Sequence, residues 1–128
     1  MIERYTIPGA VAPRGPYSHA VRAGDFIYVS GQGPIDPVTN QFVYGPIEDE
    51  VRLVLNDIKL ILEAAGASMA DVVKCSVFLR NGEDFAAMNA VYAEFFGENK
   101  PARTTVEAKF ANPTMKVEID CVAYKPKA

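Results

Sequence analysis

The sequence predicts an α+β protein with about five or six strands and two helices, in the order ββαβαββ. Two stretches repeat apolar residues at the i, i+3 and i+4 spacing that is typical of a helix buried along one face. The runs around them are rich in β-branched and aromatic residues, which favour strands. No internal repeat or polar linker divides the sequence. We therefore predict a single domain over residues 1–128.

The first two expected strands cover residues 18–22 and 26–30, with Ala23-Gly24-Asp25 as the hairpin turn between them. A helix is expected after Gly45, because Pro46 suits a helix start and the acidic residues 48–50 complement the helix dipole. Its predicted buried face consists of Ile47, Val51, Val54, Leu55, Ile58, Ile61, Leu62 and Ala65. Gly66 is expected to end this helix.

The second half of the chain continues with a predicted strand over residues 72–79. A second helix is expected to run from Asp84, as its N-cap, to Gly97. Its apolar stripe consists of Phe85, Met88, Tyr92, Phe95 and Phe96. The last two strands are predicted over residues 103–110 and 115–124.

Side chains alternate across a strand, so each strand is expected to turn one apolar face toward the helices. That face is predicted to carry Val73, Cys75, Val77, Leu79, Thr104, Val106, Ala108, Phe110, Val117, Ile119, Cys121 and Ala123. The opposite face is predicted to carry Tyr28, Ser30, Lys74, Ser76, Phe78, Arg103, Thr105, Glu107, Glu118, Asp120, Val122 and Tyr124. This second face is too aromatic for a simply solvated sheet, which predicts a homo-oligomer with polar sites near its subunit boundaries.

Charge and motif spacing disfavour several classes of function. The net charge of −3 offers no basic field for a nucleic-acid partner. His19 is the only histidine, and nothing around it has the spacing of a zinc site or a catalytic triad, so we expect a half-exposed strand residue. Gly31-Gln32-Gly33 begins like a dinucleotide-binding motif, but Pro34 prevents the helix start that the motif requires.

Cysteine usage and hydropathy predict where the protein resides. Cys75 and Cys121 lie in apolar stretches, which is typical of buried free thiols in a reducing compartment. The N-terminal residues lack a signal core, and no apolar run approaches the roughly 18 residues of a membrane span. We therefore predict a cytoplasmic protein without a membrane partner.

A few polar residues remain as candidates for chemistry. An arginine such as Arg103 on a semi-apolar strand usually binds a carboxylate, because its planar guanidinium matches two oxygens. That carboxylate belongs either to the protein or to a ligand, and the residues alone leave both open. Glu118 lies on a polar strand face where a water could be held. For Tyr17, Ser30 and Asn89, simple packing or backbone hydrogen bonding is the alternative to a role in a site.

Eight short stretches, taken together, resemble one family. They are Gly15–Ser18, Val29–Gln32, Leu62–Gly66, Val72–Lys74, Phe85–Asn89, Tyr92–Phe96, Pro101–Thr104 and Val117–Ile119. They occur in the same order as in the Rid (YjgF) family of reactive enamine/imine deaminases, RidA-like proteins among them, and the resemblance extends from about residue 8 to residue 124. The resemblance implies a chorismate-mutase-like mixed sheet backed by two helices, assembled as a homotrimer with sites between subunits.

The resemblance also implies hydrolysis of 2-aminoacrylate and related enamines or imines to 2-oxo acids and ammonia, without a metal or organic cofactor. Arg103 matches the family's carboxylate-binding arginine, and Glu118 matches its water-positioning acid. The matches to other substrate-binding residues are Tyr17, Ser30, Gly31 and Asn89. Thr105 stands where the best-known members have Cys, at a position whose main-chain groups contact the ligand. Residues 110–113, Phe-Ala-Asn-Pro, replace the Leu-Pro of many members.

Three alternatives stay open. One is a more specialised deaminase that acts on an aminomuconate-like or pyrimidine-breakdown intermediate. Another is a non-catalytic trimeric module that binds small 2-oxo acids, although the presence of both Arg103 and Glu118 favours activity. The third is an RNA-cleaving protein, which the acidic pI of about 5.1 disfavours.

Overall fold

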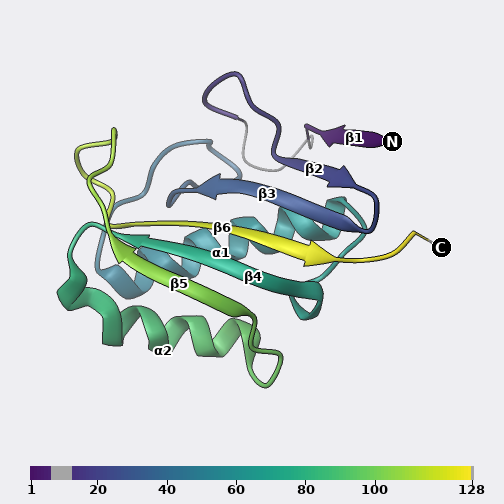
Figure 1. Ribbon diagram of the computed structural model, residues 1–128. Helices are drawn as coiled ribbons and strands as arrows, with labels where there is room; N and C mark the ends of the chain where they lie inside the picture. The colour runs from purple at the N-terminus through teal and green to yellow at the C-terminus, as the bar shows by residue number, and fades with distance from the viewer. Residues whose placement is uncertain (7–12, 128) are drawn as a thin grey trace.

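The computed structural model describes residues 1–6 and 13–127. Figure 1 shows a six-stranded sheet with two helices. The strand order is β1-β2-β3-β6-β4-β5. Neighbouring strands are antiparallel except β4 and β5, which are parallel because α2 connects them as a crossover. The predicted α+β class with a mixed sheet is confirmed.

The elements agree with most of the expected ranges. They are β1 (Ile2–Tyr5), β2 (Ala20–Ala23), β3 (Phe26–Gln32), α1 (Ile47–Ala64), β4 (Val72–Leu79), α2 (Phe85–Phe96), β5 (Ala102–Glu107) and β6 (Val117–Tyr124), with short 3-10 turns at Met69–Asp71 and Gly82–Asp84. The strand β1 was not predicted, so the order ββαβαββ is incomplete. Two of its four residues are charged, and it pairs only with β2 at the sheet edge, where a charged strand is common.

Both helices end at the predicted glycines. Gly66 has a φ of 89° and Gly97 a φ of 54°, values that favour glycine. Asp84 occupies the N-cap position of α2, as predicted, but its side chain makes no capping hydrogen bond. The nearest side-chain cap belongs to the 3-10 turn before α2, where Asn81 Oδ1 accepts from the Glu83 amide at 2.9 Å.

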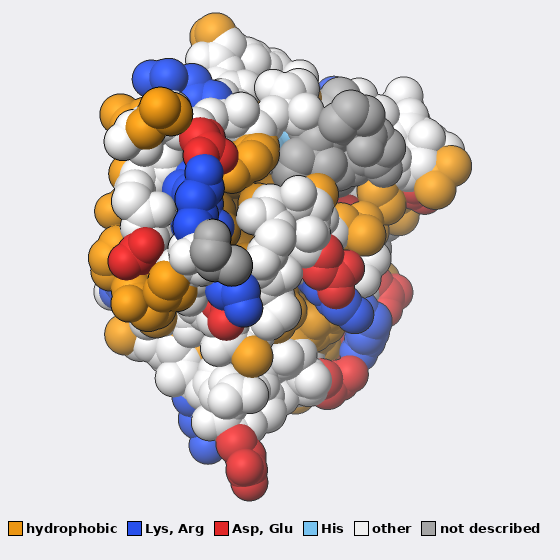
Figure 2. All heavy atoms as spheres, turned by 90° about the vertical axis from the view of Figure 1, so that its right-hand side faces the viewer, with side chains coloured by type: hydrophobic (Ala, Val, Ile, Leu, Met, Phe, Trp, Pro, Cys, Tyr) orange, Lys and Arg blue, Asp and Glu red, His pale blue; other side chains and the backbone are white. Residues whose placement is uncertain are grey.

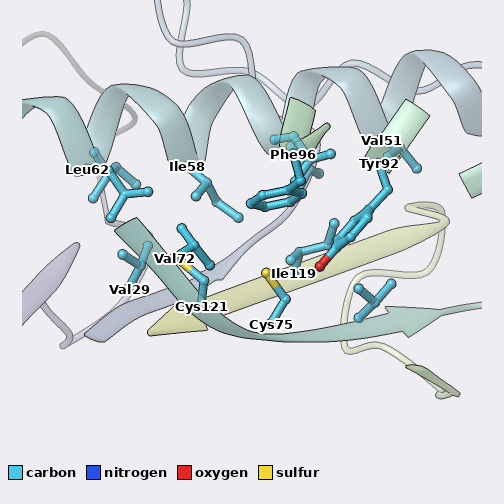
Figure 3. Packing of buried hydrophobic residues seen from close by; sticks show 14 of the residues in the cluster. Val29, Val51, Ile58, Leu62, Val72, Cys75, Tyr92, Phe96, Ile119 and Cys121 are labelled. Carbon is cyan, nitrogen blue, oxygen red and sulfur yellow. The ribbon is translucent and has the colours of Figure 1, made fainter. Parts of the chain in front are cut away.

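The core lies between the helices and one face of the sheet. Figure 3 shows Val51, Ile58 and Leu62 of α1 above strand residues such as Val29 and Ile119. Cys75 and Cys121, which face each other on β4 and β6, are both free and buried, as predicted. His19, in contrast, is only 1% exposed, which corrects the half-exposed strand position predicted for it.

The face prediction is wrong for β5. In the parallel register, Arg103 lies beside Cys75 and Thr105 beside Val77, so both turn toward the helices. Thr104 and Val106 turn to the open face instead, and Glu107, beside Leu79, turns to the helix side. The predicted faces are thus reversed for all of these β5 residues. An edge strand leaves some apolar residues exposed, so the alternation of Thr104, Val106, Ala108 and Phe110 was misleading. Ala108 and Phe110 lie beyond the end of β5.

A second correction concerns β4, where a bulge lies between Val72 and Lys74. A bulge adds one residue and shifts the alternation of side chains. Val72 is therefore buried, whereas Val73 is 43% exposed rather than facing the helices.

The open face of the sheet carries the predicted aromatic and apolar side chains. Phe26, Tyr28, Tyr124 and Val106 are all at least 40% exposed, and the Phe26 and Tyr124 rings lie 5.2 Å apart. In Figure 2, hydrophobic side chains gather along the left margin among charged ones, on the side of the sheet that faces the viewer in Figure 1. The homo-oligomer that this face suggests stays a prediction. In the described part of the chain, no helix is long and apolar enough to span a membrane. The cytoplasmic location also stays a prediction.

The buried Glu50 side chain connects the start of α1 to the start of β6. Its carboxylate accepts from the Gly45 amide at 3.1 Å, the Lys116 amide at 2.8 Å and Lys116 Nζ at 3.1 Å. We expect Glu50→Gln to lower the free energy of unfolding by about 2 kcal/mol, because the amide lacks the charge and turns an NH₂ toward donors. Urea denaturation measures this loss. Glu48→Gln, an exposed change in the same turn, is the control, and equal values for both variants would contradict the role of Glu50.

Candidate functional site

Arg103 extends from the sheet-edge strand β5 toward α2. Its guanidinium carbon lies 4.8 Å from the centre of the Tyr92 ring and 5.5 Å from that of Phe85, and Nη1 donates to the Met88 sulfur at 3.8 Å. Two aromatic faces and a thioether hold the cation without neutralising it. Among the described residues, no carboxylate lies within 4.0 Å of this guanidinium. Arg103 therefore has no ion-pair partner in the part of the chain that the structure describes.

Buried polar atoms on β5 and α2 also lack partners. Asn89 Oδ1, the Tyr92 hydroxyl and Thr105 Oγ1 make no hydrogen bond to any described residue. Burial raises the pKa of the Tyr92 hydroxyl, and the adjacent Cys75 thiol raises it further. The hydroxyl is thus a neutral group at physiological pH. Such atoms are normally satisfied by a ligand, a water or another chain, since leaving them unpaired costs about 1–3 kcal/mol each.

Glu118 lies on the other face of the sheet. It is opposite Phe78 in the register of β6 and β4, so its side chain is on the open face. A bulge in β3 between Val29 and Gln32 brings Gly31 against it. A Cβ added to Gly31 would lie 2.6 Å from Glu118 Oε2, closer than atoms can approach. Glycine at this position therefore makes room for the carboxylate.

Tyr17 and Ser30 complete this second group. Together with Gly31 and Glu118 they line an open hollow of about 330 Å³. The Ser30 hydroxyl donates to the Ser18 carbonyl at 2.7 Å, and the Tyr17 hydroxyl accepts from the Arg14 amide at 3.1 Å. Both side chains are therefore held by the segment that leads into β2.

Burial raises the pKa of the Glu118 carboxyl, and the like charge of Asp120 raises it further. Asp120 lies two residues along β6 and therefore on the same face. A carboxylate with a raised pKa is a better proton acceptor than an ordinary surface acid. Such a group can hold a water and take its proton.

The two groups do not meet within one chain. Arg103 and Thr105 lie on the sheet face that packs against the helices, and Asn89 lies on α2, whereas Tyr17, Ser30, Gly31 and Glu118 line the hollow on the open face. Arg103, Thr105 and Glu118 were predicted to share one face of the sheet, and the register of β5 corrects this prediction. One group has a cation without an ion-pair partner among the described residues, and the other has a carboxylate beside a hollow.

Several residues beside these groups escaped the sequence analysis. Arg80 donates from Nε to the Met115 carbonyl at 2.7 Å and from Nη2 to the Asn112 carbonyl at 2.5 Å. It thereby fixes residues 112–115, part of the wall next to Glu118. Phe85, Met88 and Tyr92 were assigned to the α2 core stripe, yet they also support Arg103. No local pattern marks such contacts, because the partners are far apart in sequence. Among the described residues, no group of three or more His, Cys, Asp or Glu side chains could hold a metal ion.

The described residues therefore present an arginine without an ion-pair partner on one face of the sheet and an acid beside a hollow on the other. The chain belongs to the Rid (YjgF/RutC) family: the family model described as Endoribonuclease L-PSP matches residues 8–125.

Among curated relatives, a RutC family protein of Pyrococcus horikoshii is 53% identical over 116 residues, covering 91% of this chain and 92% of the relative. The 2-iminobutanoate/2-iminopropanoate deaminase of Dermatophagoides farinae is 44% identical over 115 residues, covering 90% of each chain. At least one relative of this chain is thus named as an imine deaminase.

Solved structures show the same fold. The YjgF gene product of E. coli superposes with a TM-score of 0.88 at 36% identity, covering 95% of this chain and 98% of that one. E. coli TdcF, solved with bound serine, superposes with a TM-score of 0.88 at 33% identity, covering 96% of this chain and 99% of that one. The expected family and its fold are confirmed.

Proposed function

We propose that the protein hydrolyses reactive enamines and imines of 2-amino acids, 2-aminoacrylate among them, to 2-oxo acids and ammonia. The observation that carries this proposal is the Arg103 guanidinium, which is supported by two aromatic rings and has no carboxylate partner among the described residues. A substrate carboxylate matches its planar fork. The relative named 2-iminobutanoate/2-iminopropanoate deaminase acts, by that name, on substrates with such a group.

The proposal includes a homotrimer whose clefts join two chains. The Arg103 group of one subunit would face the Glu118 group of the next, because the two groups lie on opposite faces of one sheet. The exposed aromatic side chains on the open face and the unpaired outer edge of β5 support such an assembly.

In the proposed mechanism, Arg103 binds the substrate carboxylate, and Asn89 and Thr105 supply polar atoms nearby. An enamine first tautomerises to its imine. The imine nitrogen takes a proton from solvent. Glu118 then orients a water toward the imine carbon and accepts one of its protons as the C–O bond forms, which gives a neutral carbinolamine. Glu118 returns that proton to the nitrogen, and the C–N bond breaks to release ammonia while the hydroxyl proton passes through the Glu118 carboxylate to solvent, which leaves the 2-oxo acid. Orienting the substrate and stabilising its charge are sufficient for catalysis, since enamines and imines already hydrolyse in water.

The test couples a 2-aminoacrylate-generating dehydratase to the protein and follows pyruvate formation. We expect acceleration over the uncatalysed rate with the native protein and none with Arg103→Ala. No acceleration by the native protein would favour the non-catalytic module that binds small 2-oxo acids. The observation that favours this non-catalytic binding module is the serine bound in the E. coli TdcF structure.

Two further candidates are separable by experiment. A specialised deaminase for an aminomuconate-like or pyrimidine-breakdown intermediate would accelerate that substrate and leave 2-aminoacrylate unchanged. The matching family model is described as an endoribonuclease. The net charge of −3 disfavours an RNA substrate, and we expect no RNA binding at low salt in a gel-shift assay.

The raised pKa of Glu118 predicts the pH dependence of the reaction. The ionised carboxylate is the active form in this mechanism, so kcat/KM should rise with pH through the raised pKa. Asp120→Asn removes the like charge, which should lower the Glu118 pKa and move the acidic limb to lower pH. A pH–rate profile measures this shift. Asp25→Asn, an exposed change in the β2–β3 turn, should leave the limb in place. An unmoved limb in Asp120→Asn would contradict the assignment, as would full activity of Glu118→Gln.

A further inference from the structure

The hollow beside Glu118 continues into a second one. The first hollow is lined by Tyr17, Ser30, Gly31 and Glu118. A neighbouring hollow of about 200 Å³ is lined in part by three of the same residues, Tyr17, Gly31 and Glu118. The second hollow extends to Arg14 and Phe42 and to the wall of residues 111–115. Its volume corresponds to roughly seven waters at about 30 Å³ each. The side chain of 2-aminoacrylate is a single carbon, so a larger substrate is needed to fill this space.

The charges along the second hollow are asymmetric. Among the described lining residues, Arg14 is the one cation and Glu118 the one carboxylate. The two side chains make no ion pair within 4.0 Å, and Arg14 pairs with no other described acid. The positive charge of Arg14 is therefore not neutralised by those residues.

Arg14 is also held in position. Its Nη2 donates to the Asn40 carbonyl, and its guanidinium carbon lies 4.6 Å from the centre of the Phe42 ring. The Phe42 ring stacks on Tyr44 with centroids 5.7 Å apart, and the Tyr44 hydroxyl accepts from Asn112 Nδ2 at 3.0 Å. This chain of contacts links Arg14 to the opposite wall of the hollow. One of its five N–H donors serves Asn40, so the others are available to a planar anion.

We propose that Arg14 is a second anion-binding position in this cleft and that the preferred substrates are 2-imino acids with a distal side-chain carboxylate. This inference rests on the proposed function for the reaction, and it adds the substrate class. Arg103 of the neighbouring subunit would bind the carboxylate next to the imine, and Arg14 the one at the end of the side chain. A guanidinium already fixed by a ring and a carbonyl loses little freedom when it binds such a group.

The test compares two imines generated in place by flavin-dependent amino acid oxidases, 2-iminoglutarate from glutamate and 2-iminobutanoate from 2-aminobutyrate. We expect the native protein to have the higher kcat/KM for 2-iminoglutarate. Arg14→Met should lower that value about tenfold or more, while the value for 2-iminobutanoate changes less than twofold. Arg4→Met, an exposed change on β1, is the matched control and should alter neither. Equal losses on both substrates, or no loss on 2-iminoglutarate, would overturn the role of Arg14.

A binding measurement separates this inference from the proposed reaction. Isothermal titration should show tighter binding of 2-oxoglutarate than of 2-oxobutanoate to the native protein, and Arg14→Met should abolish the difference. A protein that hydrolyses neither imine but keeps this Arg14-dependent preference would refute the proposed reaction and support the second anion position. A protein that hydrolyses imines but binds both oxo acids equally would refute the second anion position alone.

Discussion

Arg103→Lys is expected to lower the rate of 2-aminoacrylate hydrolysis by about 100-fold or more. Lysine keeps the positive charge but loses the planar fork that binds both oxygens of a carboxylate. It also loses the flat surface that lies against Tyr92 and Phe85 in the structure. Without this support the substrate carboxylate can rotate, and the imine carbon is no longer held toward the water on Glu118.

The measurement is the coupled pyruvate assay, together with thermal melting to show that the variant is folded. Arg52→Lys is the matched control, because Arg52 pairs with Asp49 and Glu94 on the outer surface of the helices. We expect that variant to hydrolyse 2-aminoacrylate at the native rate. Native turnover by a folded Arg103→Lys variant would reject the assigned role of Arg103.

The sequence was most informative where its signals are local. The apolar periodicity and the terminal glycines of α1 and α2 come from neighbouring residues, and both helices agree closely with the structure. The side of the sheet on which Arg103 lies is not a local property. It depends on the register of β5 beside β4, which the α2 crossover fixes, so alternation along β5 alone gave the wrong face.

Residues on connecting segments were harder to predict than those on strands. Arg14 reaches the cleft through contacts with Asn40 and Phe42, which lie 26 and more residues away in the chain. Arg80 acts through the main chain of residues 112–115. Residues 110–113 were noted only because they depart from the Leu-Pro of the family pattern, and residues 111 and 112 line the hollow beside Glu118.

Asp57 is the most deeply buried acid among the described residues, on the inner side of α1 with 0% exposure. Its carboxyl lies near the Ile35 amide, but that amide donates to the Gly33 carbonyl at 2.9 Å. Neither carboxyl oxygen has a hydrogen-bond partner among the described residues. Burial raises the pKa of Asp57 to about 8, and the like charge of Asp36 contributes in the same direction. The folded protein therefore holds this proton through neutral pH.

The protonated Asp57 makes the stability of the protein depend on pH. In the unfolded chain the carboxyl ionises near pH 4, so between about pH 4 and 8 the folded state binds one more proton than the unfolded state. The contribution of Asp57 to stability is thus complete below pH 4 and declines as pH rises, by up to roughly 1.4 kcal/mol per pH unit, until about pH 8.

Asp57→Asn should remove this decline, because an amide has the shape of the protonated acid and does not ionise. We expect the variant to unfold at a higher denaturant concentration than the native protein at pH 8, with a much smaller difference at pH 5. Asp49→Asn, an exposed change on the same helix, should follow the native pH dependence. Parallel stability curves for the native protein and Asp57→Asn would mean that Asp57 is already ionised in the folded state at pH 5. A buried charge would then need a partner that the described contacts of α1 do not supply.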